Sequence, residues 1–392
     1  MQCRVLAWQE IEEIKQDLIR FNQHDVNLIN SPDKLTSCNL KLSEIYPQVA
    51  FQLKGIIIRN FPEIRFALNR GEVFLSAPLD SYRRLYTQLK KNSFFTLADK
   101  IKSTIDNYRK KDFVLKLPRN KDIDLREKVA IMGILNLTPD SFYDGGKYRT
   151  ENDLLERVEQ MIEEGVDIID VGGESTRPGA ERIEAEEEIR RTVPYIEKIT
   201  NLFDIPISID TYKAKVARDA LEAGAQMIND ISGLRFDPEM SQVASYYDVP
   251  LVIMHIKGTP KDMQINPRYD SLMEEIISYL EEGIKIATMA GVKREKLIVD
   301  PGIGFGKTLE HNLFILKKLE ELRILGCPIL IGVSRKSFIG KVLNLPVEER
   351  MIGSLAATCL AVSKGARIVR THDVKPTRQV VDLIEAILKS NV

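Results

Sequence analysis

Short apolar runs are the dominant pattern in the last two thirds of the chain, and most neighbouring runs are separated by a stretch long enough for a helix. They lack the strict alternation of a half-exposed sheet, which is typical of parallel strands buried on both faces. The pattern therefore predicts an α/β fold, a (β/α)8 TIM barrel. The eight predicted strands are Val129–Thr138, Val166–Gly173, Pro206–Thr211, Met227–Gly233, Pro250–Ile256, Leu297–Gly304, Pro328–Ser334 and Ala366–Asp373.

Several of the stretches between the predicted strands have the apolar periodicity of a helix. Gly165, Gly224, Gly291 and Gly365 follow predicted helices, and glycine is a common residue just past a helix end. The last of these helices is apolar on more than one side, which indicates a second packing partner and predicts a homodimer interface. The predicted helices are Asn152–Glu164, Tyr212–Ala223 (capped by Thr211), Ser271–Ala290 and Met351–Lys364.

Residues 1–110 lack the regular alternation of apolar runs and helical stretches. They are predicted to form a small α+β module of unknown role. We expect helices at Ile11–Arg20 and Ser81–Lys91, and strands at Ala50–Arg59 and Val73–Ala77. Basic residues in the module are interspersed with acidic ones, which favours a solvated helix face over a nucleic-acid site.

Residues 111–392 are assigned to the barrel. Phe113–Leu117 and Lys121–Leu125 predict a β-hairpin that turns at residues 118–120. Such a hairpin is well placed to plug the amino-terminal mouth of the barrel.

Composition limits the possible partners. The formal net charge is −1, which gives no electrostatic argument for nucleic acid or an anionic membrane. No apolar stretch approaches the roughly 20 residues of a membrane helix, and the N-terminus lacks a secretion signal. The four cysteines and four histidines show no zinc-ligand spacing, so reduced thiols in a soluble cytoplasmic protein are expected.

Polar residues at the predicted strand ends indicate where the chemistry lies, because the active site of a TIM barrel is built at the carboxyl ends of its strands. Asn136 ends the first strand and offers an oxygen to a hard cation or an amide N–H to a phosphate. The loop that follows contains Asp140, Phe142 and Asp144, and is interpreted either as a solvated turn or as a lid over substrate.

The second strand runs into a glycine-rich loop. Gly172 and Gly173 permit close approach of the backbone, and Thr176 and Arg177 provide donors to an anion. The alternative interpretation is that Asp170 or Glu174 holds Arg177 in a structural ion pair. The sequence does not decide between this ion pair and an anion site.

Asp210, Asn229 and Asp300 end three different strands. Burying two carboxylates and an amide at one barrel mouth is costly unless donors satisfy them. Internal Arg or Lys partners are one explanation; the favoured one is a ligand with a guanidine-like edge, such as a pterin or guanine ring. Lys336 is expected to donate to the carbonyl of that ring.

Two further segments have chemical significance. Residues 300–308 resemble a nucleotide-binding loop but fail the tests, because Pro301 and Lys307 stand where glycines are required. Arg370 and His372, two apart on the last strand, are expected to face the same side and form an anion site. His255 is a possible catalytic base, although a structural histidine is favoured.

Taken in series, the strand-end motifs resemble the dihydropteroate synthase family. The resemblance covers the chain from about Phe113 to the C-terminus, in the family's order, whereas residues 1–110 depart from its minimal form. The motifs are Gly133-Ile-Leu-Asn-Leu-Thr-Pro-Asp-Ser-Phe142, Asp170-Val-Gly-Gly-Glu-Ser-Thr-Arg-Pro-Gly179, Ile209-Asp-Thr211, Ile228-Asn-Asp-Ile-Ser-Gly233, Asp300-Pro-Gly-Ile-Gly-Phe-Gly-Lys307, Gly332-Val-Ser-Arg-Lys-Ser337 and Arg370-Thr-His-Asp373.

The resemblance implies condensation of p-aminobenzoate with 6-hydroxymethyl-7,8-dihydropterin diphosphate in folate biosynthesis, with Mg2+ as cofactor. It also implies three groups of ligands. The pterin would be held by Asp210, Asn229, Asp300 and Lys336. The diphosphate would be held by Asn136, Thr176, Arg370 and His372, with Asn136 and the acids of the first loop helping to bind Mg2+. The p-aminobenzoate pocket would be framed by Phe142, Pro178, Phe305 and Ser337, and Arg177 is a further expected substrate-binding residue. Asp210, Lys336, Arg370 and His372 would be the catalytic residues.

The residues themselves indicate how such a reaction would be assisted. An aniline nitrogen is a weak nucleophile, so the site should assist departure of the leaving group by neutralising charge on the diphosphate.

Two other functions are considered for the barrel. One is a methyltetrahydrofolate:corrinoid methyltransferase, which would not need Arg370 and His372. The other is a non-catalytic paralogue that binds pterin or a partner protein.

Overall fold

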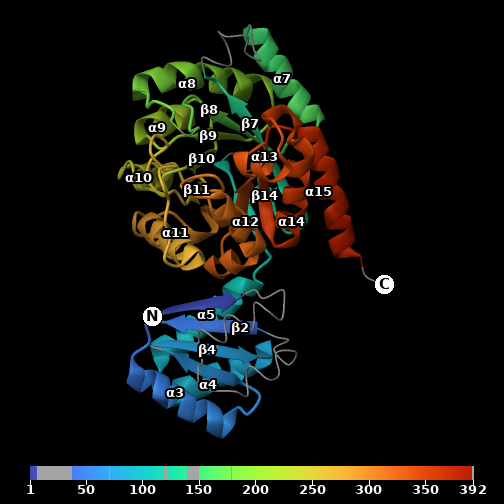
Figure 1. Cartoon of the computed structure of the whole chain (residues 1–392). Coiled ribbons are helices and arrows are strands. Elements are labelled where there is room, and N and C mark those ends of the chain that lie inside the picture. The colour runs from blue at the N-terminus through green and yellow to red at the C-terminus, as the bar shows by residue number, and fades with distance from the viewer. Residues whose placement is uncertain (7–37, 70, 119–121, 139–149, 178, 391–392) are drawn as a thin grey trace. The chain divides into compact units, whose positions relative to one another are not determined.

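The computed structural model describes residues 1–6, 38–69, 71–118, 122–138, 150–177 and 179–390 (Figure 1). The chain divides into two compact units, each described by itself. One unit comprises Met1–Lys110 together with Glu320–Gly326, and the other comprises Lys111–Leu319 together with Cys327–Val392.

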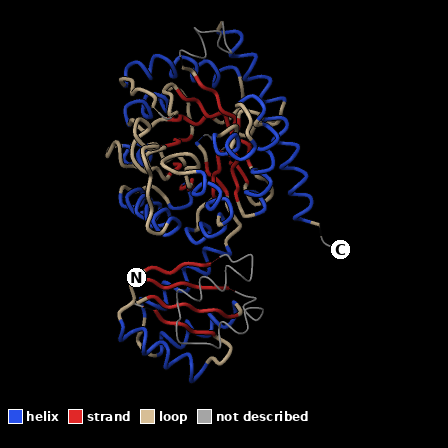
Figure 2. Tube along the Cα trace, viewed as in Figure 1, coloured by secondary structure: helices blue, strands red, loops and turns tan. Residues whose placement is uncertain are grey.

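The larger unit contains the predicted barrel, with eight parallel strands in the described part of the chain closing on themselves. Figure 2 shows these strands enclosed by helices. The strands, in chain order, are β7 (Ala130–Asn136), β8 (Ile168–Gly172), β9 (Ile207–Asp210), β10 (Met227–Asp230), β11 (Leu251–Met254), β12 (Leu297–Asp300), β13 (Ile329–Gly332) and β14 (Ala366–Thr371).

Helices alternate with these strands, and each of the four predicted helices is present with slightly different bounds. The helix predicted to follow Thr211 begins at Ala214 instead, because the carboxylate of Asp237 accepts the Ala214 N–H (2.8 Å), whereas the Thr211 hydroxyl accepts the Lys213 N–H (3.2 Å). The helical elements are α7 (Glu151–Glu163), α8 (Ala185–Leu202), α9 (Ala214–Glu222), α10 (Met240–Tyr246), α11 (Leu272–Met289), η3 (Arg294–Lys296), α12 (Leu309–Lys317), η4 (Leu319–Leu325), α13 (Ser337–Leu343), η5 (Val347–Glu349), α14 (Met351–Ser363) and α15 (Val374–Lys389).

The predicted hairpin closes the amino-terminal end of the barrel. Its strands, β5 (Val114–Lys116) and β6 (Asp122–Asp124), pair in antiparallel fashion. Leu115, Leu117 and Leu125 are buried in one apolar cluster with residues of the barrel strands, among them Met132, Ile168, Met227, Val252, Ile298, Leu330 and Ile368. The hairpin therefore completes the barrel core at the end opposite the strand carboxyl ends.

The smaller unit is built on an antiparallel sheet in the order β1-β2-β4-β3. The predicted strand at Val73–Ala77 and the predicted helix at Ser81–Lys91 are confirmed, whereas the helix expected at Ile11–Arg20 lies outside the described residues. The elements are β1 (Gln2–Leu6), β2 (Cys38–Ser43), α3 (Pro47–Asn60), β3 (Arg65–Asn69), β4 (Glu72–Ala77), α4 (Leu79–Lys91) and α5 (Phe95–Arg109).

The strand predicted at Ala50–Arg59 is wrong, because this segment belongs to helix α3. Its buried residues, Ala50, Leu53, Ile56 and Ile57, recur at helical spacing. The isoleucine run was interpreted by its β propensity, but packing of one helical face against the sheet overrides that preference. Pro47 at the start of α3 is a further helix signal, since proline is favoured in the first helical turn.

The cysteines Cys3, Cys38, Cys327 and Cys359 are free thiols, as predicted. Among the described residues, no helix is both long and apolar enough to span a membrane.

Candidate active site

The centre of the candidate active site is a network of charged side chains at the carboxyl ends of the strands. Arg370, on β14, donates through Nε to Asp170 Oδ2 (2.6 Å) and through Nη2 to Asp210 Oδ2 (2.7 Å). Asn229, on β10, donates to the same Asp170 oxygen (3.0 Å). Residues far apart in the sequence therefore converge at one mouth, as the barrel topology predicts.

This network leaves acceptors unused. Asp170 Oδ1 and Asp210 Oδ1 are buried and have no hydrogen-bond partner among the described residues. Burial raises the pKa of Asp210 above the usual carboxyl range, the Arg370 guanidinium opposes that shift, and Asp170 adds to it. Buried carboxylate oxygens are normally hydrogen-bonded, so two such orphan acceptors indicate a place for a ligand with N–H donors.

Asp300 and Lys336 form a second part of the mouth. Burial raises the pKa of Asp300 while the Lys336 ammonium opposes the shift, and burial lowers the pKa of Lys336 to about 8 while Asp300 opposes it. The Lys336 ammonium donates to the Ile303 carbonyl and lies 4.7 Å from the centre of the Phe305 ring. The sequence prediction that Asp300, Phe305 and Lys336 share one region is thus supported by the geometry.

The glycine-rich loop after β12 lies directly against the residues that follow β11. A β-carbon on Gly302 would fall 1.9 Å from the His255 carbonyl oxygen, and one on Gly306 would fall 2.3 Å from the Lys257 carbonyl oxygen. Both glycines also have positive φ angles, of 68° and 64°. Only residues without side chains permit this close approach, which brings Phe305 beside Lys336.

A buried pair, Lys307 and His255, fixes the end of this loop. Lys307 Nζ lies 2.8 Å from His255 Nδ1 and donates to the Phe305 carbonyl oxygen (2.9 Å). Burial lowers the pKa of both groups well below their usual ranges. The preferred interpretation of His255 as a structural histidine agrees with these contacts.

The loop after β8 is held by its own ion-pair cluster. Lys213 Nζ bonds to Glu174 and lies 2.6 Å from Glu188 Oε2, and the Tyr212 hydroxyl donates to Glu174 Oε1 (2.6 Å). Asp170 and Glu174 are therefore engaged with Arg370 and Lys213, which differs from the suggested pairing of either acid with Arg177. Arg177 is exposed and Thr176 is half-buried on this loop.

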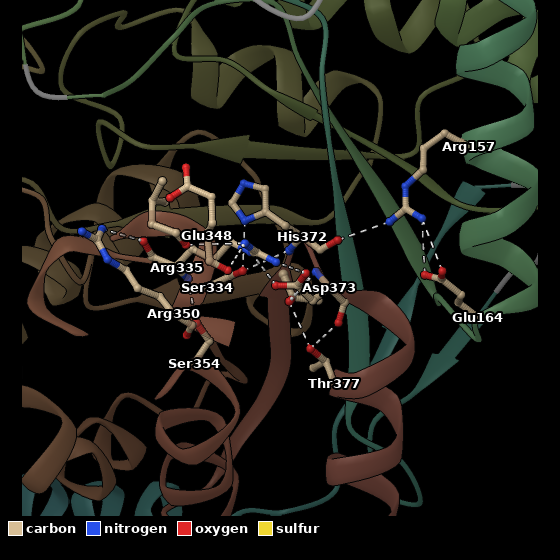
Figure 3. A network of polar contacts seen from close by, with 12 residues as sticks. Arg157, Glu164, Ser334, Arg335, Glu348, Arg350, Ser354, His372, Asp373 and Thr377 are labelled. Atoms are coloured by element: carbon tan, nitrogen blue, oxygen red, sulfur yellow. Dashed lines mark hydrogen bonds and ion pairs between the residues drawn. The ribbon is translucent and has the colours of Figure 1, made fainter. Parts of the chain in front are cut away.

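His372, just beyond β14, is oriented by the loop after β13 (Figure 3). Its backbone N–H donates to Ser334 Oγ (3.2 Å), and its Nδ1 lies 3.0 Å from the same oxygen. A hydroxyl that accepts from the backbone N–H can donate to Nδ1, so Ser334 sets the orientation of the imidazole ring. Arg370 and His372 thus have different partners within the protein, although both lie at the carboxyl end of β14.

The remaining predicted ligands lie at the same end of the barrel where they are described. Asn136 Oδ1 and Asp210 Oδ2 both lie within 4 Å of the point where a β-carbon on Gly172 would stand. Ser337 is exposed and begins α13. Phe142 and Pro178, together with the first-loop acids, lie outside the described residues.

The sequence interpretation missed the roles of several buried polar residues. The sequence predicts Asp170 only as a possible ion-pair partner of Arg177, and it does not indicate Lys213 as a site residue. Asp230 is fully buried and accepts the N–H groups of Ser232 and Leu234 (2.7 Å each), which shapes the loop after β10. A charged residue inside an otherwise apolar strand run was the available signal for Asp170 and Asp230.

Metal ligands are sparse at this site. The described residues contain no group of three His, Cys, Asp or Glu side chains arranged to hold a metal ion.

Comparison with known families identifies the class of protein. The family model described as "Pterin binding enzyme" matches residues 132–372, from β7 to the end of the last barrel strand. The chain therefore belongs to the pterin binding enzyme family.

Within this family, the curated relatives are dihydropteroate synthases. The enzyme of Clostridium beijerinckii is 51% identical over 271 residues, which cover 69% of this chain and 98% of that protein. The enzyme of Bacillus subtilis is 48% identical over 266 residues, covering 68% of this chain and 91% of its own length.

Solved structures agree with the sequence relatives. The dihydropteroate synthase of Yersinia pestis, in complex with a sulfonamide drug, has a TM-score of 0.68 at 42% identity and covers 71% of this chain and 100% of its own. The Thermus thermophilus enzyme in complex with 4-aminobenzoate has a TM-score of 0.63 at 40% identity, covering 70% and 99%. The relatives match the barrel, and about 30% of this chain lies outside the match.

Proposed function

We propose that this chain is a dihydropteroate synthase, an alkyl-group transferase of folate biosynthesis. It condenses 6-hydroxymethyl-7,8-dihydropterin diphosphate with p-aminobenzoate and releases diphosphate. The single observation that carries this proposal is the set of buried acceptors at the barrel mouth facing Lys336, in a chain whose barrel spans nearly the whole length of curated dihydropteroate synthases.

The pterin is proposed to bind among Asp210, Asn229, Asp300 and Lys336. A pterin ring presents adjacent N–H donors, and a carboxylate accepts such donors in two-pronged fashion. Asp210 has one oxygen engaged with Arg370 and one without a partner, so it can accept from the ring while Arg370 stays in place. Lys336 then donates to the ring carbonyl.

The diphosphate is proposed to bind beside Arg370, with His372, Thr176 and Arg177 as further contacts. Burial would lower the pKa of Arg370, but the Asp170 and Asp210 carboxylates raise it above its usual range, so the guanidinium stays charged. Asn136 Oδ1 would hold Mg2+ together with phosphate oxygens, and the ion would supply positive charge to the leaving group.

The p-aminobenzoate ring is proposed to lie against Phe305, with its carboxylate near Ser337. Phe142 and Pro178 complete this proposed pocket. Structures of homologues determined in the presence of 4-aminobenzoate and of pteroic acid support both small-molecule partners.

In the reaction, the amine nitrogen forms a bond to the pterin methylene carbon as the carbon–oxygen bond to the diphosphate breaks. The electron pair of that bond leaves with the diphosphate, and the amine proton passes to solvent. The positive charge of Arg370 and a hydrogen bond from His372 stabilise the departing anion, and the ionised Asp210 offsets charge on the methylene-bearing ring. No covalent bond to the enzyme is needed.

The test compares two variants. Asp300→Ala should abolish detectable binding of the pterin diphosphate in calorimetry, because the lost carboxylate is a direct ligand. Arg370→Ala should lower initial rates of diphosphate release at least a hundredfold, the scale seen when one charge-stabilising donor is removed. Wild-type pterin affinity in Asp300→Ala would contradict the assignment, and pterin binding by the wild type without turnover would favour the non-catalytic alternative.

We also propose a cytoplasmic homodimer formed through α14. Ile352 and Leu360 of this helix are 75% and 42% exposed, and Leu383 of the adjacent α15 is 63% exposed. Large apolar side chains exposed on two neighbouring helices are consistent with a surface covered by another protein. Ile352→Glu should shift the mass measured by light scattering from dimer to monomer; an unchanged mass would place the interface elsewhere.

A further inference from the structure

The loop after β13 sends three consecutive side chains to three different places, and Figure 3 shows the first two of them, Ser334 and Arg335. Ser334 bonds to His372, Arg335 bonds to Asp373, and Lys336 reaches the Ile303 carbonyl. This divergence depends on the backbone of Arg335, whose φ angle is +55°. A non-glycine residue is uncommon in the left-handed region and persists there only where its surroundings enforce it.

The backbone of Arg335 is held on both sides. Its N–H donates to Ser354 Oγ (2.8 Å), and its carbonyl oxygen accepts from Arg350 Nη1 (3.3 Å). The Ser354 hydroxyl in turn donates to the Arg350 carbonyl oxygen (2.8 Å). The start of α14 therefore enforces the strained turn between Ser334 and Lys336.

The side chain of Arg335 forms a two-pronged ion pair with Asp373. Nε donates to Asp373 Oδ2 (2.9 Å) and Nη2 donates to Oδ1 (2.8 Å). The remaining nitrogen, Nη1, donates to the carbonyl oxygens of Val347 (3.4 Å) and Glu348 (3.1 Å). Every guanidinium nitrogen thus has a partner in the protein, and lysine could not reproduce this planar arrangement.

Asp373 is equally constrained and follows His372 directly. Its N–H donates to Thr371 Oγ1 (3.1 Å), and its carbonyl oxygen accepts from Thr377 Oγ1 (2.6 Å) in the first turn of α15. On the other side of His372, Arg157 of α7 donates to the His372 carbonyl oxygen (3.2 Å). The carboxylate of Asp373 is thus a fixed anchor for the loop after β13.

We infer that Arg335 and Asp373 are positioning residues that align the two halves of the active site. One half, Lys336 and Ser337, belongs to the pterin and p-aminobenzoate subsites; the other, Arg370 and His372, belongs to the diphosphate subsite. This inference rests on the proposed function. According to this inference, the ion pair sets the distance between the ligands of the leaving group and the ligands of the two rings. Neither residue of the pair contacts substrate.

The kinetic consequence follows from this geometry. If the pair aligns the two halves, each half still binds its own ligand when the pair is broken, but the reacting atoms are misplaced. A misplacement of about 1 Å can cost about a hundredfold in rate. Arg335→Lys and Asp373→Asn should therefore lower kcat by roughly tenfold to a hundredfold, while KM for p-aminobenzoate and Kd for the pterin diphosphate change by less than about threefold.

A double variant tests whether the two residues act as one unit. Arg335→Lys/Asp373→Asn should lose no more kcat than the more damaged single variant, because removing either partner already breaks the alignment. Losses that multiply would show two independent roles and would overturn the inference.

A matched control is available at the opposite end of the barrel. Arg378 of α15 pairs with Asp167 (3.3 Å) and donates to the Val129 carbonyl oxygen (3.0 Å), and its side chain is also largely buried. Arg378→Lys and Asp167→Asn should lower the Tm to an extent comparable with the Arg335 and Asp373 variants, yet leave kcat within about twofold.

The outcomes are distinct. An inactive wild type would refute the proposed function before the pair is tested. An active wild type with unchanged kcat in Arg335→Lys and Asp373→Asn would overturn the inference alone, as would kcat losses that merely follow Tm in both sets of variants. If Arg335→Lys does not fold, Asp373→Asn, which retains the shape of the side chain, decides by the same criteria.

Discussion

At the scale of single residues, burial determines the protonation state of the proposed pterin ligands. Asp210 and Asp300 have raised pKa values because the barrel mouth desolvates them, and the pKa of Lys336 falls to about 8 for the same reason. The ionised carboxylates accept N–H groups and the protonated amine donates to a carbonyl. The protonation state that can bind the pterin, with ionised carboxylates and a protonated Lys336, therefore exists only in a limited pH range.

A bell-shaped dependence of kcat/KM on pH is expected. Activity should fall as pH decreases through the raised carboxyl pKa values, because protonated acids cannot accept both ring donors, and as pH increases through about 8, where Lys336 loses its proton. Initial rates at subsaturating pterin diphosphate measure this profile. Lys336→Arg should move the alkaline limb upward, since arginine stays charged; an alkaline limb unchanged in that variant would assign it to another group.

At the scale of elements, the two ends of the barrel have separate tasks. The strand carboxyl ends carry the polar network around Arg370, whereas the β5–β6 hairpin covers the amino-terminal end with Leu115 and its neighbours. Strand-end loops accept functional residues because the closed sheet beneath them is rigid. Changes in the hairpin should therefore alter stability without altering chemistry.

Leu115→Ala should destabilise the barrel by about 2–5 kcal/mol, the usual cost of a cavity left by a fully buried leucine. Hydrogen exchange of barrel amides in increasing urea measures this loss, since the chain has two units and a single unfolding transition is not assured. Val114 is half-buried on the same strand, so Val114→Ala is the control, and a smaller loss of unfolding free energy is expected for it. A changed kcat in folded Leu115→Ala would contradict the division of tasks.

At the scale of the whole molecule, the barrel is accompanied by a second unit, whose main part, Met1–Lys110, lies outside the family match at residues 132–372. That unit also contains Glu320–Gly326, most of which belongs to η4; here Asn107 Nδ2 donates to the Ile324 carbonyl oxygen (2.9 Å) and the Tyr108 ring centre is 4.5 Å from the Arg323 guanidinium. Because relatives match only the barrel, we propose that residues 111–392 suffice for catalysis.

A truncated chain of residues 111–392 should retain kcat and both KM values within about threefold, but show a lower Tm because η4 loses its partners on α5. Steady-state kinetics, thermal unfolding and light scattering on the full-length and truncated proteins measure this. A truncated protein with native circular dichroism but no activity would show that residues 1–110 contribute to the site.

Much of the fold could be predicted because periodicity and turn residues are local properties of the chain. The barrel strands and the hairpin were recognised in this way, while the isoleucine run of α3 was misassigned because its β propensity competed with a helical burial pattern. The described site residues lie at the strand ends, as the sequence predicts, but their pairing was not predicted. Asp170 was associated with Arg177 in the sequence, whereas in the structure it accepts from Arg370 and Asn229.

By itself, the sequence determined the barrel, the end of the barrel at which polar groups gather, and the chemical types of those groups. These follow from the order of strands and from the rule that parallel strands align their carboxyl ends. Only the tertiary structure decided which carboxylate meets which cation and which oxygens remain unpaired. Those outcomes depend on side-chain directions and burial across strands up to two hundred residues apart, as with Asp170 and Arg370, which no local pattern encodes.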